Sequence, residues 1–214
     1  MEHLIKKINI DQNTKTKIGD KMNIKLGIAL TIVALFISGC NKQEIVYDKT
    51  PYKTKECIKE LSSGAEINPE EKIDKIVVYK SKRKLYTYRD GKKVDEFRIS
   101  LGKNGDKGDK IKAGDYRTPE GTYSIVRKKC DSRLYKSLMI SYPNKADKVR
   151  ARAKGVNPGG YITIHGQPKW NANGAGDSHT LAIDWTEGCM AVPNLAMDKL
   201  WEAVKNGVAI TIHA

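Results

Sequence analysis

From Ile73 to the C-terminus, short β-rich runs follow one another, each bounded by residues that favour turns. The hairpin signal is strongest at Asp90-Gly91, a dipeptide that suits a tight turn between two strands. The predicted strands are Lys75–Lys80, Leu85–Arg89, Lys93–Leu101, Thr122–Arg127, Leu138–Tyr142, Tyr161–His165 and Val208–Ala214. This pattern predicts a mainly β domain built from several antiparallel hairpins.

One amphipathic helix is predicted late in the chain, starting at Pro193-Asn194 and ending before Gly207. Its apolar side chains recur at the spacing of one helix face and are Met197, Leu200, Trp201 and Val204. Residues 40–72 are polar and carry Pro and Gly. They are therefore predicted to be a tether with at most a short helix around Lys55–Leu61.

The strongly apolar stretch Leu26–Ile37 lies near the N-terminus. As a helix, its twelve residues would rise about 18 Å, too short for a bilayer core of about 30 Å. Its length instead fits the apolar region of a signal peptide. The sequence Ile37-Ser38-Gly39-Cys40 then resembles a bacterial lipobox. We expect a signal over residues 1–39, with Met22 as an alternative start, and a lipid-anchored Cys40; an ordinary signal sequence with a chance cysteine is the alternative.

The formal net charge is +14, from 39 Lys and Arg against 25 Asp and Glu. Six of these basic and three of these acidic residues lie in residues 1–39, so the mature chain would carry +11. An exported chain does not meet genomic DNA, and no aromatic-basic stacking motif is present, so we expect no nucleic-acid partner. The charge fits either an anionic cell envelope or a solvated lysine-rich surface.

Four cysteines are present, none in a CxxC pair, which excludes a zinc ribbon or a thioredoxin-type motif. Cys57 and Cys130 are candidates for a disulfide, but sequence does not show whether their Cα atoms approach closely enough. The sequence contains no metal-ligand cluster and no nucleotide-binding Gly-rich loop, so no metal or cofactor is expected.

Candidate chemistry lies in two segments, His165-Gly166 and Gly188-Cys189. A cysteine nucleophile reacts as the thiolate, and a histidine is both its base and its positive neighbour. Gly188 would let substrate approach, and neighbouring backbone N–H groups would form an oxyanion hole. A disulfide-bonded cysteine and a structural histidine are the alternatives at this point.

The ordered motifs of this chain resemble those of the YkuD-type L,D-transpeptidase catalytic domain. His165-Gly166 matches the family's His-Gly, and Thr186-Glu187-Gly188-Cys189 matches its Ser/Thr-x-Gly-Cys segment. Two upstream motifs, a Ser-x-Gly strand end and a Thr-Pro-x-Gly turn, are matched by Ser100-Leu101-Gly102 and Thr118-Pro119-Glu120-Gly121. The resemblance covers 73–214 and implies a YkuD-like β-sandwich or barrel, a catalytic domain over these residues and peptidoglycan as substrate.

The same resemblance implies a mechanism. Cys189 would attack the stem peptide after the L-centre of diaminopimelate and form a thioester, with His165 as base and the Gly166 carbonyl orienting its ring. N–H groups around Gly188 and Cys189 would hold the oxyanion. An amine acceptor would give transpeptidation, and water would give carboxypeptidase or hydrolase activity at the periplasmic face of the envelope.

Departures from the family pattern leave the reaction open. Glu187 and Ala191 occupy places where many members have His or Arg, and the surrounding pattern is similar to the YafK-like murein branch. That branch includes hydrolases that trim stems or detach a wall-bound lipoprotein, so hydrolysis and crosslinking are expected about equally. A non-catalytic wall-binding lipoprotein is the alternative from another class.

Five further residues are candidates for substrate binding, and four of them have a structural alternative. They are Thr186, Tyr116, Arg117, Trp185 and His179. Trp185 suits packing as well as stacking on substrate, and Tyr116 and Arg117 suit support of a turn. His179 lies in a Gly/Asn-rich loop, Gln167–Thr180, predicted to cover the site, where an exposed histidine is the plain alternative.

Overall fold

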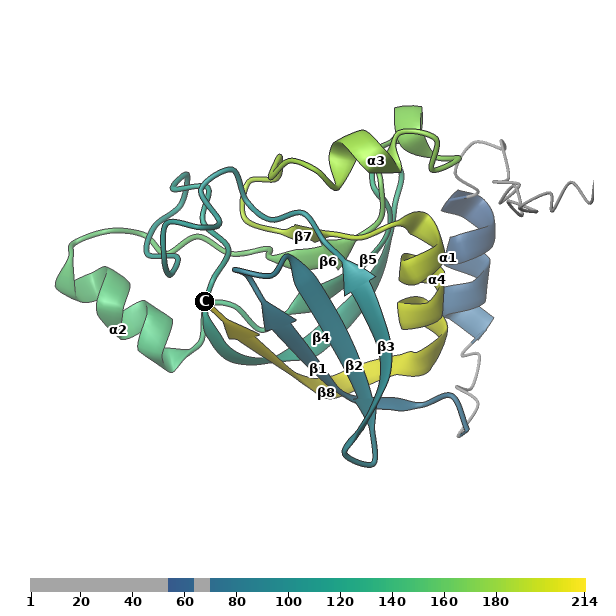
Figure 1. Ribbon diagram of the computed structural model, residues 1–214. Helices are drawn as coiled ribbons and strands as arrows, with labels where there is room; N and C mark the ends of the chain where they lie inside the picture. The colour runs from purple at the N-terminus through teal and green to yellow at the C-terminus, as the bar shows by residue number, and fades with distance from the viewer. Residues whose placement is uncertain (1–53, 64–69) are drawn as a thin grey trace, which may run out of the picture. The chain divides into compact units, whose positions relative to one another are not determined.

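The computed structural model describes residues 54–63 and 70–214, all within one unit, Glu44–Ala214 (Figure 1). The predicted signal, its Leu26–Ile37 stretch and Cys40 lie outside the described residues. Across the ranges described, no helix is long and apolar enough to cross a membrane.

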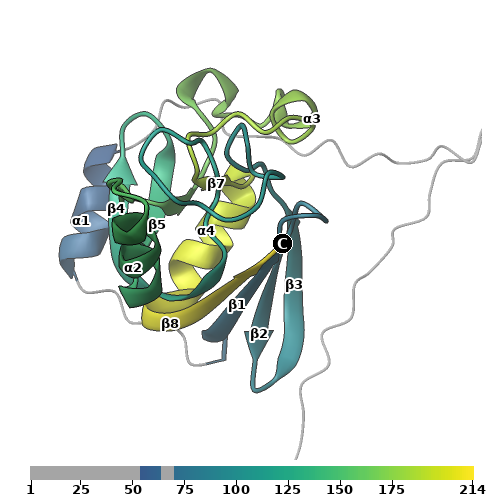
Figure 2. The same cartoon turned by 90° about the vertical axis from the view of Figure 1, so that its left-hand side faces the viewer.

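Eight strands form a mixed sheet in the order β3-β2-β1-β8-β4-β5-β6-β7. The strands are β1 (Ile73–Tyr79), β2 (Lys84–Arg89), β3 (Lys92–Arg98), β4 (Gly121–Asp131), β5 (Tyr135–Ile140), β6 (Thr163–His165), β7 (Met190–Ala191) and β8 (Val204–His213). The pairs β1–β8 and β6–β7 are parallel, and the other neighbours are antiparallel. The predicted mainly β fold is confirmed, as one sheet that curls on itself (Figure 2).

The helical segments are α1 (Thr54–Ser63), α2 (Lys145–Ala153), the 3-10 turn η1 (Lys169–Asn171), α3 (Asp177–Thr180) and α4 (Asn194–Ala203). The predicted late helix is confirmed as α4, which lies inside the curl of the sheet (Figure 2). Its Met197, Leu200 and Trp201 are at most 2% exposed and join the core formed by the inner face of the sheet.

The predicted end of this helix was wrong. Val204 is already extended, with φ −103° and ψ 124°, and it pairs with Ile73 in the sheet. Its buried, β-branched side chain suits a strand. Gly207 therefore lies within β8, at φ 91°, and does not end α4.

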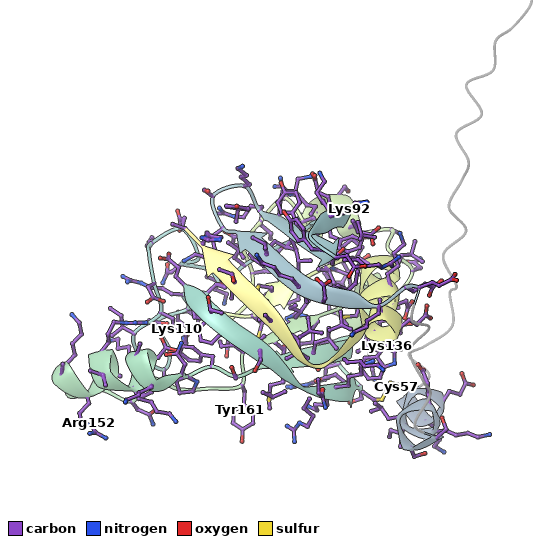
Figure 3. All side chains as sticks on the ribbon, turned by 90° about the horizontal axis from the view of Figure 1, so that it is seen from below. Cys57, Lys92, Lys110, Lys136, Arg152 and Tyr161 are labelled. Atoms are coloured by element: carbon purple, nitrogen blue, oxygen red, sulfur yellow. A yellow bond between two sulfur atoms is a disulfide. The ribbon has the colours of Figure 1, made fainter. Side chains whose placement is uncertain are left out.

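The short helix expected around Lys55–Leu61 is confirmed as α1, and it is fastened to the sheet. A disulfide joins Cys57 to Cys130 of β4, with Cα atoms 5.9 Å apart, which settles the pairing that sequence left open. The Trp201 indole donates to Glu60 of α1 at 2.7 Å. Figure 3 shows Cys57 and Lys136 beside each other at the end of the sheet where α1 packs.

Helix α2 was not predicted, because its sequence is mostly polar. A capping box starts it: Asn144 accepts from the Asp147 N–H, and the Asp147 carboxylate accepts from the Asn144 N–H. Asp147 is 3% exposed and also accepts from the Tyr123 hydroxyl and from Arg150. Polar contacts, and not an apolar stripe, therefore hold α2 against the rest of the domain.

Candidate active site

Cys189 immediately precedes β7, in a turn organised by the hydroxyl of Thr186. That hydroxyl donates to the Cys189 carbonyl oxygen at 2.7 Å and accepts from the Gly188 N–H at 3.2 Å. The main chain of Thr186 is itself bound on both sides, to the Leu101 carbonyl and to the Lys103 N–H. Thr186 is 4% exposed, so the structure turns this candidate substrate contact toward the backbone.

Glycine is required at position 188 on two grounds. Its φ of 132° is unfavourable for other residues. A Cβ there would also lie 2.8 Å from the Arg117 carbonyl oxygen. The backbone of Tyr116–Arg117 therefore packs directly against the turn that presents Cys189. This contact fits the alternative in which these two residues support a turn and do not bind substrate.

His165 ends β6, and the imidazole is fixed by two contacts. Nδ1 lies 2.7 Å from the Gly166 carbonyl oxygen, and the Trp185 ring packs edge-on at 5.6 Å between centroids. A carbonyl oxygen only accepts, so Nδ1 carries the proton and Nε2 is left as the base. The side chain is buried, and this orientation is the one that the family resemblance implies for Gly166.

The Gly166 carbonyl is positioned by contacts on both sides. The Gly166 N–H donates to the Lys136 carbonyl at 3.1 Å, and a Cβ on Gly166 would lie 2.4 Å from Asn194 Oδ1. Asn194 in turn accepts from the Gln167 N–H at 2.8 Å and donates to the Ala172 carbonyl. The sequence indicates Asn194 only as the start of a helix and gives no sign of this role.

The parallel pairing of β6 with β7 brings the thiol to the imidazole. Ile164 pairs with Met190, so Cys189 lies beside Thr163, whose hydroxyl donates to Sγ at 3.5 Å. Burial raises the pKa of the Cys189 thiol, but the hydrogen bond and charge of His165 and the bonds from Thr163 outweigh it, leaving the pKa below its ordinary value. Cys189 is the free cysteine of the described residues and is partly exposed.

The segment before Cys189 is held by an ion pair that sequence did not reveal. Asp184 accepts from Nε and Nη2 of Arg83, at 2.9 and 2.6 Å, and also from the Leu101 N–H. Both side chains are largely buried. Their separation in sequence left no local signal for the pair.

The side chains of the remaining candidates make other contacts in this structure. Tyr116 is 38% exposed, with Lys103 over its ring. The Arg117 guanidinium donates to the Asp109 carbonyl. His179 is exposed on α3, in a segment where the Asn171 side chain donates to Asp177 and accepts from the Gly176 N–H. Nowhere in residues 54–63 or 70–214 do three His, Cys, Asp or Glu side chains gather as metal ligands would.

Sequence comparisons identify the family of the chain. The family model of the L,D-transpeptidase catalytic domain, YkuD, matches residues 73–212. The chain is 33% identical over 135 residues to YafK, a candidate L,D-transpeptidase of Escherichia coli, in both strain K12 and strain O157:H7. The aligned part is 60% of this chain and 46% of YafK, so the chain spans about half the length of the curated relatives it matches.

Two solved structures are also similar. Bd1075 of Bdellovibrio bacteriovorus is 27% identical, with 68% of this chain and 50% of that chain covered and a TM-score of 0.48. The helical cell shape determining protein Pgp2 of Campylobacter jejuni is 27% identical, with 76% and 56% covered and a TM-score of 0.49.

Proposed function

Because the chain belongs to the YkuD family of L,D-transpeptidase catalytic domains, we propose that it is a peptidoglycan-modifying enzyme with Cys189 as nucleophile. The observation that carries the proposal is the chain of contacts from the Gly166 carbonyl through His165 to the Cys189 thiol. A lowered thiol pKa beside an oriented imidazole is what nucleophilic catalysis needs.

In the first step the Cys189 thiolate attacks the carbonyl carbon at the L-centre of diaminopimelate in a tetrapeptide stem. The Cys189 N–H is the donor that we assign to the oxyanion, since the Gly188 N–H already donates to Thr186. His165 has taken the thiol proton and passes it to the leaving amine. The C–N bond breaks, D-alanine departs and a thioester remains on Sγ.

In the second step an acceptor attacks the thioester. His165 removes a proton from the acceptor, the C–S bond breaks and the thiolate is restored. An amine acceptor produces a crosslink or a protein attachment, whereas water produces a tripeptide. Where the amine that leaves in the first step is a wall-bound lipoprotein instead of D-alanine, the same two steps with water detach it. The acceptor is the part of the proposal that product analysis decides.

The test is incubation of the purified protein with tetrapeptide muropeptides, beside C189A. Dimers would identify transpeptidation, and tripeptides would identify hydrolysis. A carbapenem is expected to acylate Cys189 and add its mass to the intact protein. Binding to the cell wall with neither product nor adduct would favour the non-catalytic wall-binding alternative and refute the enzyme.

Membership of a peptidoglycan enzyme family places the protein in the cell envelope. The Cys57–Cys130 disulfide supports an oxidising compartment. A lipid anchor on Cys40 is part of the proposal and rests on the lipobox-like sequence. Cells fed a labelled fatty acid should label the full chain and fail to label C40A; equal labelling of both would refute the anchor.

A further inference from the structure

The register of the sheet aligns an arginine with the nucleophile. Arg127 of β4 pairs with Met139 of β5, which pairs with Thr163 of β6, whose hydroxyl contacts Cys189 Sγ. Residues that pair directly across strands point to the same face. The four side chains therefore form one row on the outer face, because the next row, which includes Leu138, lies in the core.

A β-bulge places Arg127 in this row. Ile125 pairs with Ile140, but the next pair is Arg127 with Met139, so Val126 is the extra residue. Ile125 is fully buried, and regular alternation would send the side chain two positions later into the core as well. The bulge re-aims Arg127 to the face of Cys189, and such bulges are common beside active sites.

Arg127 is exposed, and its guanidinium has no ionic partner in the part of the chain that the structure describes. Its Nη2 contacts Met139 Sδ at 3.8 Å. Arg83, Arg133 and Arg150, by contrast, lie within ion-pair distance of Asp184, Asp131 and Asp109. Among the residues described here, no carboxylate forms such a pair with Arg127.

We propose that Arg127 binds a carboxylate of the stem peptide while Cys189 attacks the carbonyl. This rests on the proposed function and assigns its substrate groove to the open row Arg127–Met139–Thr163. The neighbouring cations are engaged elsewhere, since Arg117 donates to the Asp109 carbonyl and Lys103 covers the Tyr116 ring. Arg127 is a specificity residue and does not touch the reacting atoms.

The spacing of the strands selects which carboxylate fits. Adjacent strands lie about 4.8 Å apart, so the main chains at Arg127 and Thr163 are about 10 Å apart across β5, and the Arg127 side chain reaches toward β5 to contact Met139. The carboxylate of the departing terminal residue lies only one residue spacing, about 3.8 Å, from the attacked carbonyl. Arg127 should therefore bind a carboxylate carried by another part of the stem, such as that on the distal centre of diaminopimelate.

The test measures binding apart from chemistry. Titration calorimetry compares C189A with R127A/C189A on three tetrapeptide stems: unmodified, amidated at the terminal carboxylate alone, and amidated at all the other carboxylates. We expect R127A to weaken binding about tenfold on the first two stems, less at high salt, and to have no effect on the third. R127K should lie between, because Lys lacks the planar fork of Arg.

The matched control is R152A/C189A, which removes an exposed arginine of α2, apart from Tyr161 and the sheet face in Figure 3. It should bind every stem as C189A does. Equal losses for R127A and R152A, an R127A effect confined to the terminal carboxylate, or no binding of any stem by C189A would overturn the proposal.

Turnover by the single variant R127A separates this proposal from the proposed function. If the wild type forms product and R127A forms it equally well from every stem, Arg127 has no such role and the enzyme stands. If the wild type forms no product while the calorimetric difference persists, the chemistry fails and the binding role of Arg127 stands.

Discussion

Replacing Thr186 with Val tests whether one buried hydroxyl holds the turn that presents Cys189. The two side chains have nearly the same shape, but Val cannot donate to the Cys189 carbonyl or accept from the Gly188 N–H. Both backbone groups would lose their partner in a turn where Thr186 and Gly188 are buried. The variant therefore removes hydrogen bonds with little change in packing volume.

The cost follows from those two lost partners. An unsatisfied buried polar group costs about 1–3 kcal/mol, and part of the cost is relieved where the turn shifts toward water. We expect T186V to lower the free energy of unfolding by about 3 kcal/mol. In a domain of this size that corresponds to a melting temperature lower by roughly 6–12 °C. A shifted turn also misplaces the thiol, so acylation of folded protein should slow by about 10- to 100-fold.

The assay is thermal unfolding followed by carbapenem acylation at a temperature where each variant is folded. T186S is the matched control, since it keeps the hydroxyl and loses only a methyl group. It should retain most of the stability and the acylation rate. If T186V melts within 2 °C of the wild type and acylates at the same rate, the hydroxyl does not organise the turn and the reasoning fails.

Three further predictions follow from the contacts of the described residues. Cys189 should be alkylated by iodoacetamide with a pH midpoint below that of a free thiol, because the interactions with His165 and Thr163 outweigh the effect of burial on the thiol pKa. H165Q should raise the midpoint, and an unchanged pH profile would contradict the pairing of His165 with Cys189. C57S/C130S should lose up to about 4 kcal/mol in urea unfolding, since the disulfide closes a loop between residues 73 positions apart; unchanged stability would show that α1 is not held by it. Burial raises the pKa of Asp115, but the hydrogen bonds from Lys110 and from backbone N–H groups outweigh burial, so the pKa in the folded protein is lowered. The ionised Asp115 carboxylate therefore stabilises the fold above about pH 4, and this stabilisation is lost as the pH falls through the folded pKa. D115N should therefore be less stable than the wild type at pH 7, and the difference should shrink in acid; a constant difference would refute this assignment.

Periodicity predicted the strands and α4 because apolar residues of these segments reach one core. The ends of the strands differ from the prediction where pairing with a neighbouring strand stops. Ile99 and Leu101 alternate like strand residues and are fully buried, yet β3 ends at Arg98. Helix α2 lacked an apolar stripe, and its sequence signal was the Asn-x-x-Asp capping box at Asn144. Local polar contacts of this kind are weaker signals than periodicity.

In the site, sequence singled out Cys189, His165 and their glycines, since nucleophile, base and close backbone approach require particular residue types. It did not reveal Thr163, Asn194 or the Arg83–Asp184 pair, because their contacts come from strand register and from segments far apart in the chain. The buried Lys80 is another case: it binds Glu120 and the Thr118 carbonyl and fixes the loop before β4. Lysine in a sequence gives no sign of burial.

The central claim is that Cys189 accepts the acyl group of a peptide stem. The most direct measurement is the intact mass of the protein after rapid acid quench from a tetrapeptide stem, followed by mapping of the modified peptide. The wild type should carry the stem without its terminal D-alanine on Cys189, and C189A should carry nothing and release no D-alanine. Release of D-alanine by C189A at the wild-type rate would contradict the account.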